Sequence, residues 1–399
     1  MNILVIGDSS STNLGDPILT NCTKYLTDTV CAQKNIPCKT TIFDIVGRKS
    51  VSHNANTNLS PTPKKASTML NNKLIVDIKI LIKWFLKDKK TFTKRLYSAI
   101  SNNQKWLFVI AGGAFISDSL LYGLRLNLIS RIAEKENIKI IFNSVGLEKT
   151  VFNSLNYPVI RNMLKSKAIT YFSTRDCVDM IPKITNRKNF FVQTADSGLF
   201  ACEAYGIKKN EDNVVGIGVI SLEAYHSVKK NEPRAKKVSE ESLMQFWHNI
   251  INQLEKQNIK WKVFTNGGPK DYLLAQKLMQ RYNLPKENLL PLPNTPNDLL
   301  ESISKFKAVI AHRLHSLIIS TSFEIPVVPV QWSGKIQNFA DLIDMSEYIL
   351  WPEAKNGLKA AQFVQNEDFS FKEHTVSLAK QKSAEYLENA IIQTIEKYY

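Results

Sequence analysis

The stretch that decides the fold of this chain runs from Lys307 to Phe339 and reads KAVIAHRLHSLIISTSFEIPVVPVQWSGKIQNF. Its first apolar run, Ala308–Ala311, is typical of a buried strand, and apolar residues at helical spacing follow it directly. Pro326 then opens a second apolar run, Val327–Gln331. Because strands that alternate with helices usually pair in parallel, the stretch predicts one unit of an α/β fold.

Charged and polar side chains stand where the first of these strands gives way to the helix. His312, Arg313, Leu314 and His315 occupy this junction, and Lys335 follows the second strand. A helix N-terminus carries unpaired N–H groups and the positive end of the helix dipole, both of which attract anions. With a fork-shaped guanidinium beside them, these groups suit a phosphate or a carboxylate. The alternative interpretation is structural, with Arg313 as a cap and the histidines on the surface.

The same alternation covers the rest of the chain. Further strands are predicted over Asn2–Gly7, Thr40–Ile45, Trp106–Ala111, Lys139–Val145, Ala168–Ser173, Val214–Ile220 and Lys260–Thr265, and helices over Leu120–Lys135, Glu240–Gln257, Lys270–Tyr282 and Asp368–Tyr399. The alternation restarts after the polar stretch Lys208–Asn213, and 399 residues exceed what one compact core usually holds. We therefore predict an α/β chain of two Rossmann-like domains facing across a cleft. They comprise residues 1–205 and residues 206–399, the second ending in the long helix.

The charge of the chain points to anionic partners. Lys and Arg number 52 against 36 Asp and Glu, a formal net charge of +16. No nucleic-acid motif accompanies this charge, so we expect no nucleic-acid partner. The five cysteines show no CxxC pair, and the N-terminus MNILVIGDSS reads as a strand, not a signal peptide. No apolar run approaches the ~20 residues that cross a bilayer, so we expect a cytoplasmic protein, with peripheral contact at the inner membrane face as an option.

A basic insertion, residues 50–95, interrupts the alternation. Ser50–Pro63 is polar and rich in Asn and Pro, which predicts a mobile loop. From residue 74 to residue 95 a helical pattern sets many lysines beside an apolar stripe, which consists of Leu74, Ile78, Leu81, Ile82 and Phe85. Such a helix either lies on an anionic membrane or packs on its own domain with a solvated lysine face. We favour packing, because any surface helix of a globular protein has an apolar stripe.

The loop after the first strand, residues 7–16, offers a second cluster of candidates. It is neither a GxGxxG loop nor a P-loop, but its Gly, Ser and Asn residues, Asn13 among them, permit close approach of a ligand to the backbone. Asp16 is a candidate base toward a hydroxyl if its carboxylate points into the cleft. A plain role as a helix cap explains Asp16 equally well.

Other candidates follow predicted strands at the same edge of the sheets. Gly112 and Gly113 end one strand, where glycine relieves crowding with or without a ligand. Arg175 follows another strand and would face the cleft, although a neighbouring Asp also fits a structural pair. Asn266 ends a strand of the second domain in a glycine turn. The chain has no HExxH motif and no spacing typical of a nucleophilic triad or a paired-carboxylate metal cluster, so we predict no dedicated metal site.

In order and spacing, these pieces resemble the polysaccharide pyruvyl transferase family over roughly residues 1–345. The resemblance is carried by Asn13-Leu14-Gly15-Asp16, Gly112-Gly113, Thr174-Arg175-Asp176, Phe264-Thr265-Asn266-Gly267 with Asp271, and His312-Arg313-Leu314-His315 with Pro326 and Lys335. It implies two Rossmann-like domains similar to those of GT-B glycosyltransferases. It also implies phosphoenolpyruvate as donor, no further cofactor, and a sugar or lipid-linked glycan acceptor that receives a pyruvate ketal during capsule or lipopolysaccharide synthesis.

The same resemblance assigns roles to residues. The family's phosphoenolpyruvate-binding arginines match Arg175 and Arg313, and its site histidine matches His315. Ketal formation needs a proton at the methylene carbon, which makes His315, or else His312, a candidate general acid or phosphate clamp, with Asp16 as candidate base. Further substrate contacts are expected from Leu314, His312, Lys335, Asn13, Gly112, Gly113 and Asn266.

Two other functions compete with this hypothesis. A GT-B glycosyltransferase would use the same strand–helix edge to bind the diphosphate of a nucleotide sugar or the carboxylate of a sialic acid. A non-catalytic binder of anionic glycans or membranes would account for the net charge and for the basic helix, and its binding would depend strongly on salt.

Overall fold

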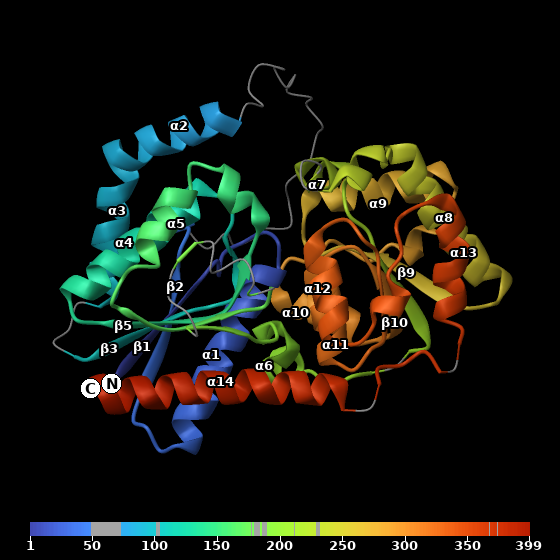
Figure 1. The fold of residues 1–399 in the computed structure, drawn as a ribbon. Coiled ribbons are helices and arrows are strands. Elements are labelled where there is room, and N and C mark those ends of the chain that lie inside the picture. Colours follow the sequence, from blue (N-terminus) through green and yellow to red (C-terminus); the bar gives the residue numbers. More distant parts are fainter. Residues whose placement is uncertain are drawn as a thin grey trace.

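The protein consists of two parallel β-sheets that lie side by side, each flanked by helices (Figure 1). This computed structural model describes residues 1–48, 73–100, 104–176, 190–210, 212–228 and 232–399 apart from 367 and 373, together with 178, 184 and 185. The predicted α/β class with two Rossmann-like units is confirmed. The loop predicted over Ser50–Pro63 lies outside the described residues.

The first sheet has seven strands in the described part of the chain. Six of them are arranged in the order β2-β1-β3-β5-β6-β7, and the seventh, β4, pairs with β5. The strands are β1 (Asn2–Gly7), β2 (Lys39–Asp44), β3 (Trp106–Ile110), β4 (Gly113–Ile116), β5 (Lys139–Leu147), β6 (Ile169–Thr174) and β7 (Phe191–Gln193). The helices of this half are α1 (Gly15–Gln33), α2 (Lys73–Lys83), α3 (Lys89–Ala99), α4 (Leu120–Lys135), α5 (Tyr157–Met163) and α6 (Ala201–Tyr205).

Both faces of the first sheet are covered, as β1 illustrates. Ile3 and Val5 pack in the apolar cluster that contains α1, whereas Leu4 and Ile6 pack on the other face, in the cluster that contains α4. All four side chains are at most 1% exposed. A strand buried on both faces has a continuous apolar run, and this run made β1 predictable.

The second sheet has four strands in the order β11-β10-β8-β9, and all of its pairings are parallel. They are β8 (Val214–Gly218), β9 (Lys260–Phe264), β10 (Phe306–Ala311) and β11 (Val327–Pro329). Its helices are α7 (Leu222–Val228), α8 (Glu240–Lys256), α9 (Pro269–Arg281), α10 (Pro296–Ile303), α11 (Leu314–Ser322), α12 (Gly334–Leu342) and α13 (Ala354–Phe363). The strands predicted for both sheets are confirmed to within about two residues at either end.

The C-terminal helix α14 (Thr375–Tyr398) runs back to the first sheet, so the two chain termini lie side by side (Figure 1). Although it follows the second sheet in sequence, it packs against α1, β5 and β6. The amide of Ala195 donates to Ser383 Oγ at 2.7 Å, and the amide of Lys139 donates to Tyr399 Oη at 3.0 Å. The helix was predicted to begin at Asp368, but it begins at Thr375, after the left-handed residue His374 (φ 65°).

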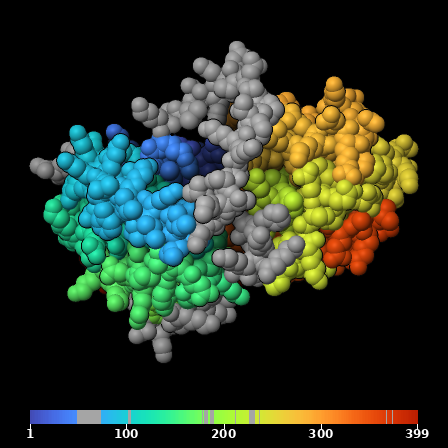
Figure 2. All heavy atoms as spheres, turned by 90° about the horizontal axis from the view of Figure 1, so that it is seen from above, coloured from blue at the N-terminus to red at the C-terminus, as the bar shows by residue number. Residues whose placement is uncertain are grey.

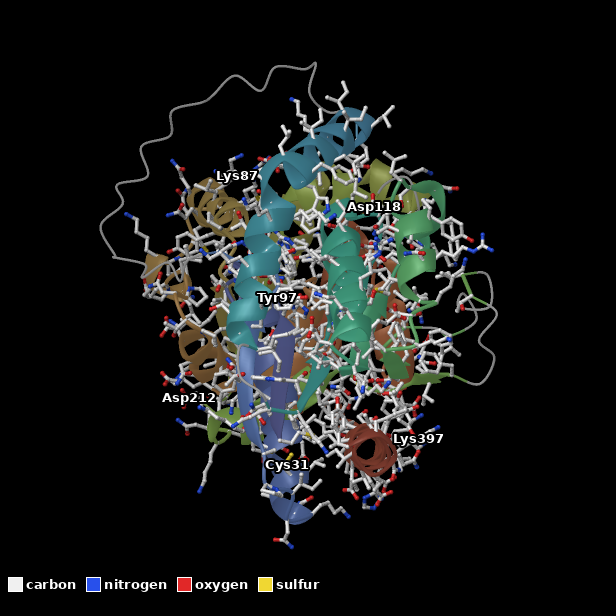
Figure 3. All side chains as sticks on the ribbon, turned by 90° about the vertical axis from the view of Figure 1, so that its left-hand side faces the viewer. Cys31, Lys87, Tyr97, Asp118, Asp212 and Lys397 are labelled. Carbon is white, nitrogen blue, oxygen red and sulfur yellow. The ribbon has the colours of Figure 1, made fainter. Side chains whose placement is uncertain are left out.

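The basic insertion forms a nearly continuous helix in its described part, but its apolar stripe does not pack as predicted. α2 leads through the π-helical turn Trp84–Asp88 into α3, and the side chains that face the domain include Asp77, Trp84, Phe92 and Leu96. Most of the predicted stripe is exposed. Figure 3 shows side chains of this helix, Lys87 among them, on the outside of the first half. No helix in the described part of the chain has the length and apolarity needed to span a bilayer.

The loop after β1 touches the second half of the chain at its glycine turn. Leu14 N donates to Asn266 O at 3.0 Å. Gly267 has a φ of 93°, and a Cβ on it would lie 2.8 Å from the carbonyl oxygen of Thr12. Glycine is therefore required here both by backbone conformation and by close approach of the two halves.

We predict that Gly267→Ala destabilises the protein more than Gly206→Ala does. Both glycines have positive φ, but a Cβ on Gly206 meets nothing within 4 Å. The Gly206 variant therefore carries backbone strain alone, on the order of 1 kcal/mol. The Gly267 variant adds the collision with Thr12, and its urea midpoint should fall further by the equivalent of about 1–3 kcal/mol. Equal midpoints would show that the two halves do not rely on this contact.

Candidate active site

The candidate site lies where the chain order of each sheet reverses. In the first sheet this point falls between β1 and β3, and in the second sheet it falls between β8 and β10. Ligands of open α/β sheets bind beyond the carboxyl ends of the strands at such points. The loop after β1 enters α1 there, and the residues after β10 enter α11. The N-termini of these two helices meet across the junction of the two halves.

The meeting point is a direct contact between Gly15 and His315. A Cβ on Gly15 would lie 1.9 Å from His315 Nδ1, so a larger residue at this position must displace the imidazole. Asn13 Nδ2 lies 3.4 Å from His315 Nδ1 and 3.1 Å from Asp16 Oδ2. When the Asn13 amide donates to both, Nδ1 of the imidazole is an acceptor and Nε2 carries the proton. The predicted residues Asn13, Asp16 and His315 are therefore brought together.

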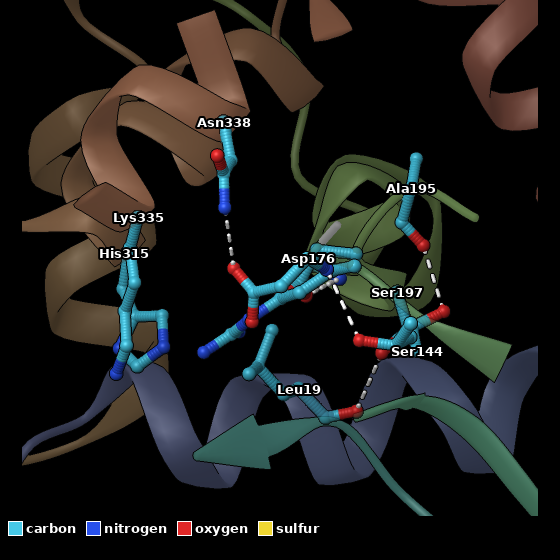
Figure 4. Close-up of polar contacts among 12 residues, drawn as sticks. Leu19, Ser144, Asp176, Ala195, Ser197, His315, Lys335 and Asn338 are labelled. Atoms are coloured by element: carbon cyan, nitrogen blue, oxygen red, sulfur yellow. Dashed lines mark hydrogen bonds and ion pairs between the residues drawn. The ribbon is translucent and has the colours of Figure 1, made fainter. Parts of the chain in front are cut away.

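Three cationic side chains act on His315. Burial is the main reason why the pKa of His315 lies well below its usual range, and the charges of Arg175, Lys335 and Arg313 lower it further. Lys335 lies next to His315 beside the start of α1 (Figure 4). These cations come from both halves of the chain, because Arg175 follows β6 whereas the other two follow β10 and β11. The imidazole is therefore neutral at pH 7 in the protein without ligand.

Arg175 is held by a buried carboxylate. Its Nη1 pairs with Asp196 Oδ2, and both side chains are nearly inaccessible, at 6% and 1% exposure. Asp196 Oδ1 also accepts a hydrogen bond from Gly198 N at 2.9 Å. Arg175 Nε is buried and makes no hydrogen bond. An unpartnered buried N–H group is costly, so this donor is available for an acceptor that enters the site.

Arg313 is held in a similar way from the second half. Its Nε and Nη2 both donate to Asp271 Oδ2, at 2.8 and 2.7 Å. Asp271, in the first turn of α9, accepts a further hydrogen bond from Ser221 N at 2.9 Å. The Arg313 side chain remains 27% exposed. Asp271 therefore fixes the orientation of the guanidinium while part of it stays accessible.

Polar contacts across the junction hold α12 against the first sheet. Lys335 pairs with Glu148, which follows β5, and Asn338 Nδ2 donates to Asp176 Oδ1 at 3.1 Å (Figure 4). Asp176 Oδ2 accepts from Leu147 N at 2.7 Å. Arg175, Leu314 and Lys335 help to line a cavity of about 10 Å³ here, which is room for about one water molecule. The structure therefore represents a closed arrangement of the two halves.

Two carboxylates near the start of α1, Asp8 and Asp16, differ in their environment. Asp8 is paired with Arg48 at 2.6 Å and accepts from Tyr122 Oη at 2.7 Å. Asp16 accepts from Ser11 Oγ at 3.0 Å, but burial and the charge of Asp8 raise its pKa to about 6. Asp16 is therefore suited to gain and lose a proton near neutral pH. No group of three or more His, Cys, Asp or Glu residues in the described part of the chain is placed to hold a metal ion.

His312, a predicted substrate contact and alternative acid, lies outside this site. It is fully buried, its ring packs edge-on against Tyr225 and Trp247, and neither ring nitrogen has a hydrogen-bond partner. Burial lowers its pKa well below the usual range. The roles proposed for His312 do not fit this position, because the side chain turns into the core of the second half.

The remaining predicted residues have structural surroundings. A Cβ on Gly112 would lie 3.6 Å from both Leu19 and Ser197, so this glycine borders packed side chains. Gly113 begins β4 with a φ of 143°, a conformation that favours glycine. Asn266 Oδ1 accepts from Ser316 Oγ at 2.6 Å, which ties the end of β9 to α11. Gly112, Gly113 and Asn266 therefore have structural roles next to the site, in packing, backbone conformation and hydrogen bonding.

Sequence reasoning missed two of the three carboxylates that pair with the cations, Asp196 and Glu148. Asp196 and Glu148 lie far along the chain from the motif at residues 312–315, and no spacing rule connects them to it. The Asp-Ser-Gly run at 196–198 is a helix-cap signal that marks Asp196, although not its partner Arg175. Gly146 was also missed: a Cβ on it would lie 3.2 Å from Arg175 Nη2.

Comparisons with known proteins identify the family and the fold. A family model described as polysaccharide pyruvyl transferase matches residues 62–334. No curated protein matches the chain in sequence. Similar solved structures include the UDP-GlcNAc 2-epimerase of Neisseria meningitidis bound to UDP-GlcNAc (TM-score 0.54, 9% identity, 98% of this chain and 100% of that chain).

Two further solved structures show the same likeness. The UDP-GlcNAc 2-epimerase of Methanocaldococcus jannaschii has a TM-score of 0.54 at 10% identity, over 98% of this chain and 99% of that chain. MnaA of S. aureus with UDP has a TM-score of 0.51 at 9% identity, over 100% and 96%. At such identities the likeness concerns the fold alone, which is of the GT-B type.

The raised pKa of Asp16 predicts that Asp16→Asn stabilises the protein at alkaline pH. Because the folded-state pKa of about 6 exceeds the unfolded value of about 3.8, ionisation of Asp16 opposes folding. At about 1.4 kcal/mol per pKa unit, the variant gains at most about 3 kcal/mol at pH 8. This gain should shrink as the pH falls from 6 toward 4, where the native Asp16 is protonated. Urea midpoints across this range test the prediction, and a variant less stable than the native protein at pH 8 would contradict it.

Proposed function

The chain belongs to the polysaccharide pyruvyl transferase family and is therefore a transferase, and we propose that it moves the enolpyruvyl unit of phosphoenolpyruvate onto a pair of sugar hydroxyls. The product is a pyruvate ketal on a precursor of a bacterial surface polysaccharide. The observation that carries the proposal is that Arg175 and Lys335, from different halves of the chain, line one cavity, and that their charges and that of Arg313 all act on His315.

Phosphoenolpyruvate matches this charge pattern because it carries a carboxylate and a phosphate. Arg175 and Arg313 each keep donors beyond those paired with their carboxylates, and charge-assisted hydrogen bonds from guanidinium to either anion are strong. The N-terminus of α11 adds backbone N–H groups and a favourable dipole. The negative charge of the ligand would thus balance the positive charge of the three cations.

The cavity holds only about one water molecule, so the donor must bind first to an open form of the protein in which the two halves are apart. The contacts Lys335–Glu148 and Asn338–Asp176 join α12 to the first half, and separation of the halves would break both. Lys335 would then exchange Glu148 for the anionic donor. Closure around the donor excludes water, which protects the reactive intermediate from hydrolysis.

His315 and Asp16 are placed to move the protons of the reaction. A proton added to C3 of phosphoenolpyruvate makes C2 electrophilic, one sugar hydroxyl forms a bond to C2 and gives its proton to Asp16, and the C2–O bond to phosphate breaks. After the phosphate has left, the neighbouring hydroxyl forms the second bond to C2 and closes the ketal, and its proton goes to the side chain that had protonated C3. His315 is neutral before the donor binds, so it acts as the acid only after an anion has neutralised the surrounding cations and raised its pKa.

A nucleotide sugar is the competing donor, because two of the fold neighbours named above, from S. aureus and Neisseria meningitidis, contain UDP or UDP-GlcNAc in their structures. A nucleotide needs a base pocket in addition to a phosphate site. The cavity that Arg175 and Lys335 help to line lies between the halves and has no room for a base in this closed form. Support for the nucleotide sugar therefore rests on the fold alone.

We predict that Arg313→Ala weakens phosphoenolpyruvate binding by about 10- to 100-fold, the usual range for loss of a hydrogen bond to a charged group. The variant also leaves Asp271 buried and unpaired, so Arg313→Lys, which keeps the charge but loses the fork, serves as a second variant. Arg281→Ala is the matched control, because Arg281 is exposed and pairs with Glu241 on α8. Calorimetric affinities for folded variants that equal the native value would overturn the proposed donor site.

We also predict that the protein takes up a proton at His315 when phosphoenolpyruvate binds. The lowered pKa of His315 rises when the anion offsets Arg175, Lys335 and Arg313, so affinity should increase as the pH falls toward neutrality from above. Calorimetry in buffers of different ionisation enthalpy measures the uptake. His315→Gln should remove it, whereas any protonation of the ligand itself persists in the variant. The same proton count in both proteins would contradict the role given to His315.

A further inference from the structure

An exposed apolar surface lies on residues 73–99, here called the α2–α3 segment. Of the thirteen large apolar side chains that are exposed in the described part of the chain, seven belong to this segment. Ile82, Phe85 and Leu86 are 55%, 68% and 81% exposed. Scattered exposed apolar residues need no explanation, but a contiguous group of this kind marks an interaction site.

The segment is anchored by a different row of residues. Trp84 and Phe92 are both 3% exposed, and their ring centroids lie 6.2 Å apart. The carboxylate of Asp77 is buried and paired with Lys73. Because this inner row already fixes the helix on its domain, the outer apolar residues are not needed for packing within the chain. The π-helical turn Trp84–Asp88 contains both Phe85 and Leu86, the two most exposed.

Lysines border the apolar surface. The α2–α3 segment has eight basic residues against two acidic ones, Asp77 and Asp88. Asp77 is buried, and Asp88 lies 3.4 Å from Lys83. Lys79, Lys83 and Lys87 follow each other at intervals of four, parallel to Ile78, Ile82 and Leu86, so a cationic row runs beside the apolar row on the outside of the helix. The segment forms a broad part of the upper surface of the first half (Figure 2).

We propose that the α2–α3 segment docks the protein on an anionic membrane surface, parallel to the bilayer plane. Phe85, Leu86 and Ile82 would enter the boundary between headgroups and acyl chains, and the lysine row would contact anionic headgroups. A second copy of the chain fits poorly, because two such cationic rows repel each other. A nucleic acid satisfies the lysines but leaves the apolar side chains in water. The membrane is the one partner of these three that satisfies both rows.

Cosedimentation with lipid vesicles tests this docking without any measurement of activity, so its outcome is independent of the proposed function. The native protein should pellet with vesicles of equal parts phosphatidylcholine and phosphatidylglycerol and remain in solution with phosphatidylcholine alone. Binding should weaken at 1 M salt, where charges are screened within about 3 Å.

Two double variants separate the contributions of charge and apolar contact. Lys79→Glu with Lys87→Glu should lower the partition coefficient by at least about tenfold, since each lysine near an anionic surface accounts for roughly fivefold. Phe85→Ser with Leu86→Ser should lower it by more than about tenfold. The matched controls are Lys256→Glu with Lys382→Glu, and Leu378→Ser, which change exposed residues on α8 and α14, away from α2 (Figure 1). The controls should bind like the native protein.

Three results would overturn the proposal, given circular dichroism spectra that show the variants folded. The first is a native protein that fails to pellet with the anionic vesicles. The second is a loss of binding in the control variants equal to that in the segment variants. The third is a dimer in solution that dissociates in Phe85→Ser with Leu86→Ser, which would assign the surface to a second copy of the chain.

Discussion

The contact between Gly15 and His315 is the constraint on which the site depends. It brings the N-termini of α1 and α11 together across two sheets whose strands are otherwise unconnected by pairing. Any side chain at residue 15 would occupy the position of the imidazole. Through this contact the loop after β1, with Asn13 and Asp16, faces the residues after β10. Asn13 contacts both Asp16 and His315, and the charges of three cations act on the same histidine.

The electrostatics of the site follow from this placement. Arg175, Arg313 and Lys335 each have a carboxylate partner, in Asp196, Asp271 and Glu148 respectively. Two of these partners, Asp196 and Asp271, are buried and serve to orient the guanidinium groups, whereas Glu148 is partly exposed and lies across the junction. The junction pair is therefore the one that a donor anion can replace at the lowest cost, because partly solvated ion pairs contribute little to stability. Asp196 and Asp271 therefore orient the two arginines, whereas Glu148 holds Lys335 in a pair that the donor can replace.

The sequence predicted the parts of this arrangement that are local. Apolar runs such as Val327–Gln331 mark buried strands, and polar residues directly after a strand lie at the sheet edge whatever the rest of the fold does, so Arg313 and His315 could be identified. Side-chain direction and long-range pairing could not be predicted. His312 immediately precedes Arg313, yet it turns into an aromatic core, and Asp196 reaches Arg175 only through the folded sheet. The exposed stripe of α2 was misread because periodicity reveals an amphipathic helix without telling which face meets the domain.

The central claim is that the three cations around His315 form a site for phosphoenolpyruvate. The most direct measurement is the unfolding free energy of the native protein with phosphoenolpyruvate and, separately, with UDP-GlcNAc. A ligand that binds only the folded state at a hundredfold excess over its Kd raises stability by about 2.7 kcal/mol. The account predicts a rise of this size with phosphoenolpyruvate, and a rise with UDP-GlcNAc alone would contradict it.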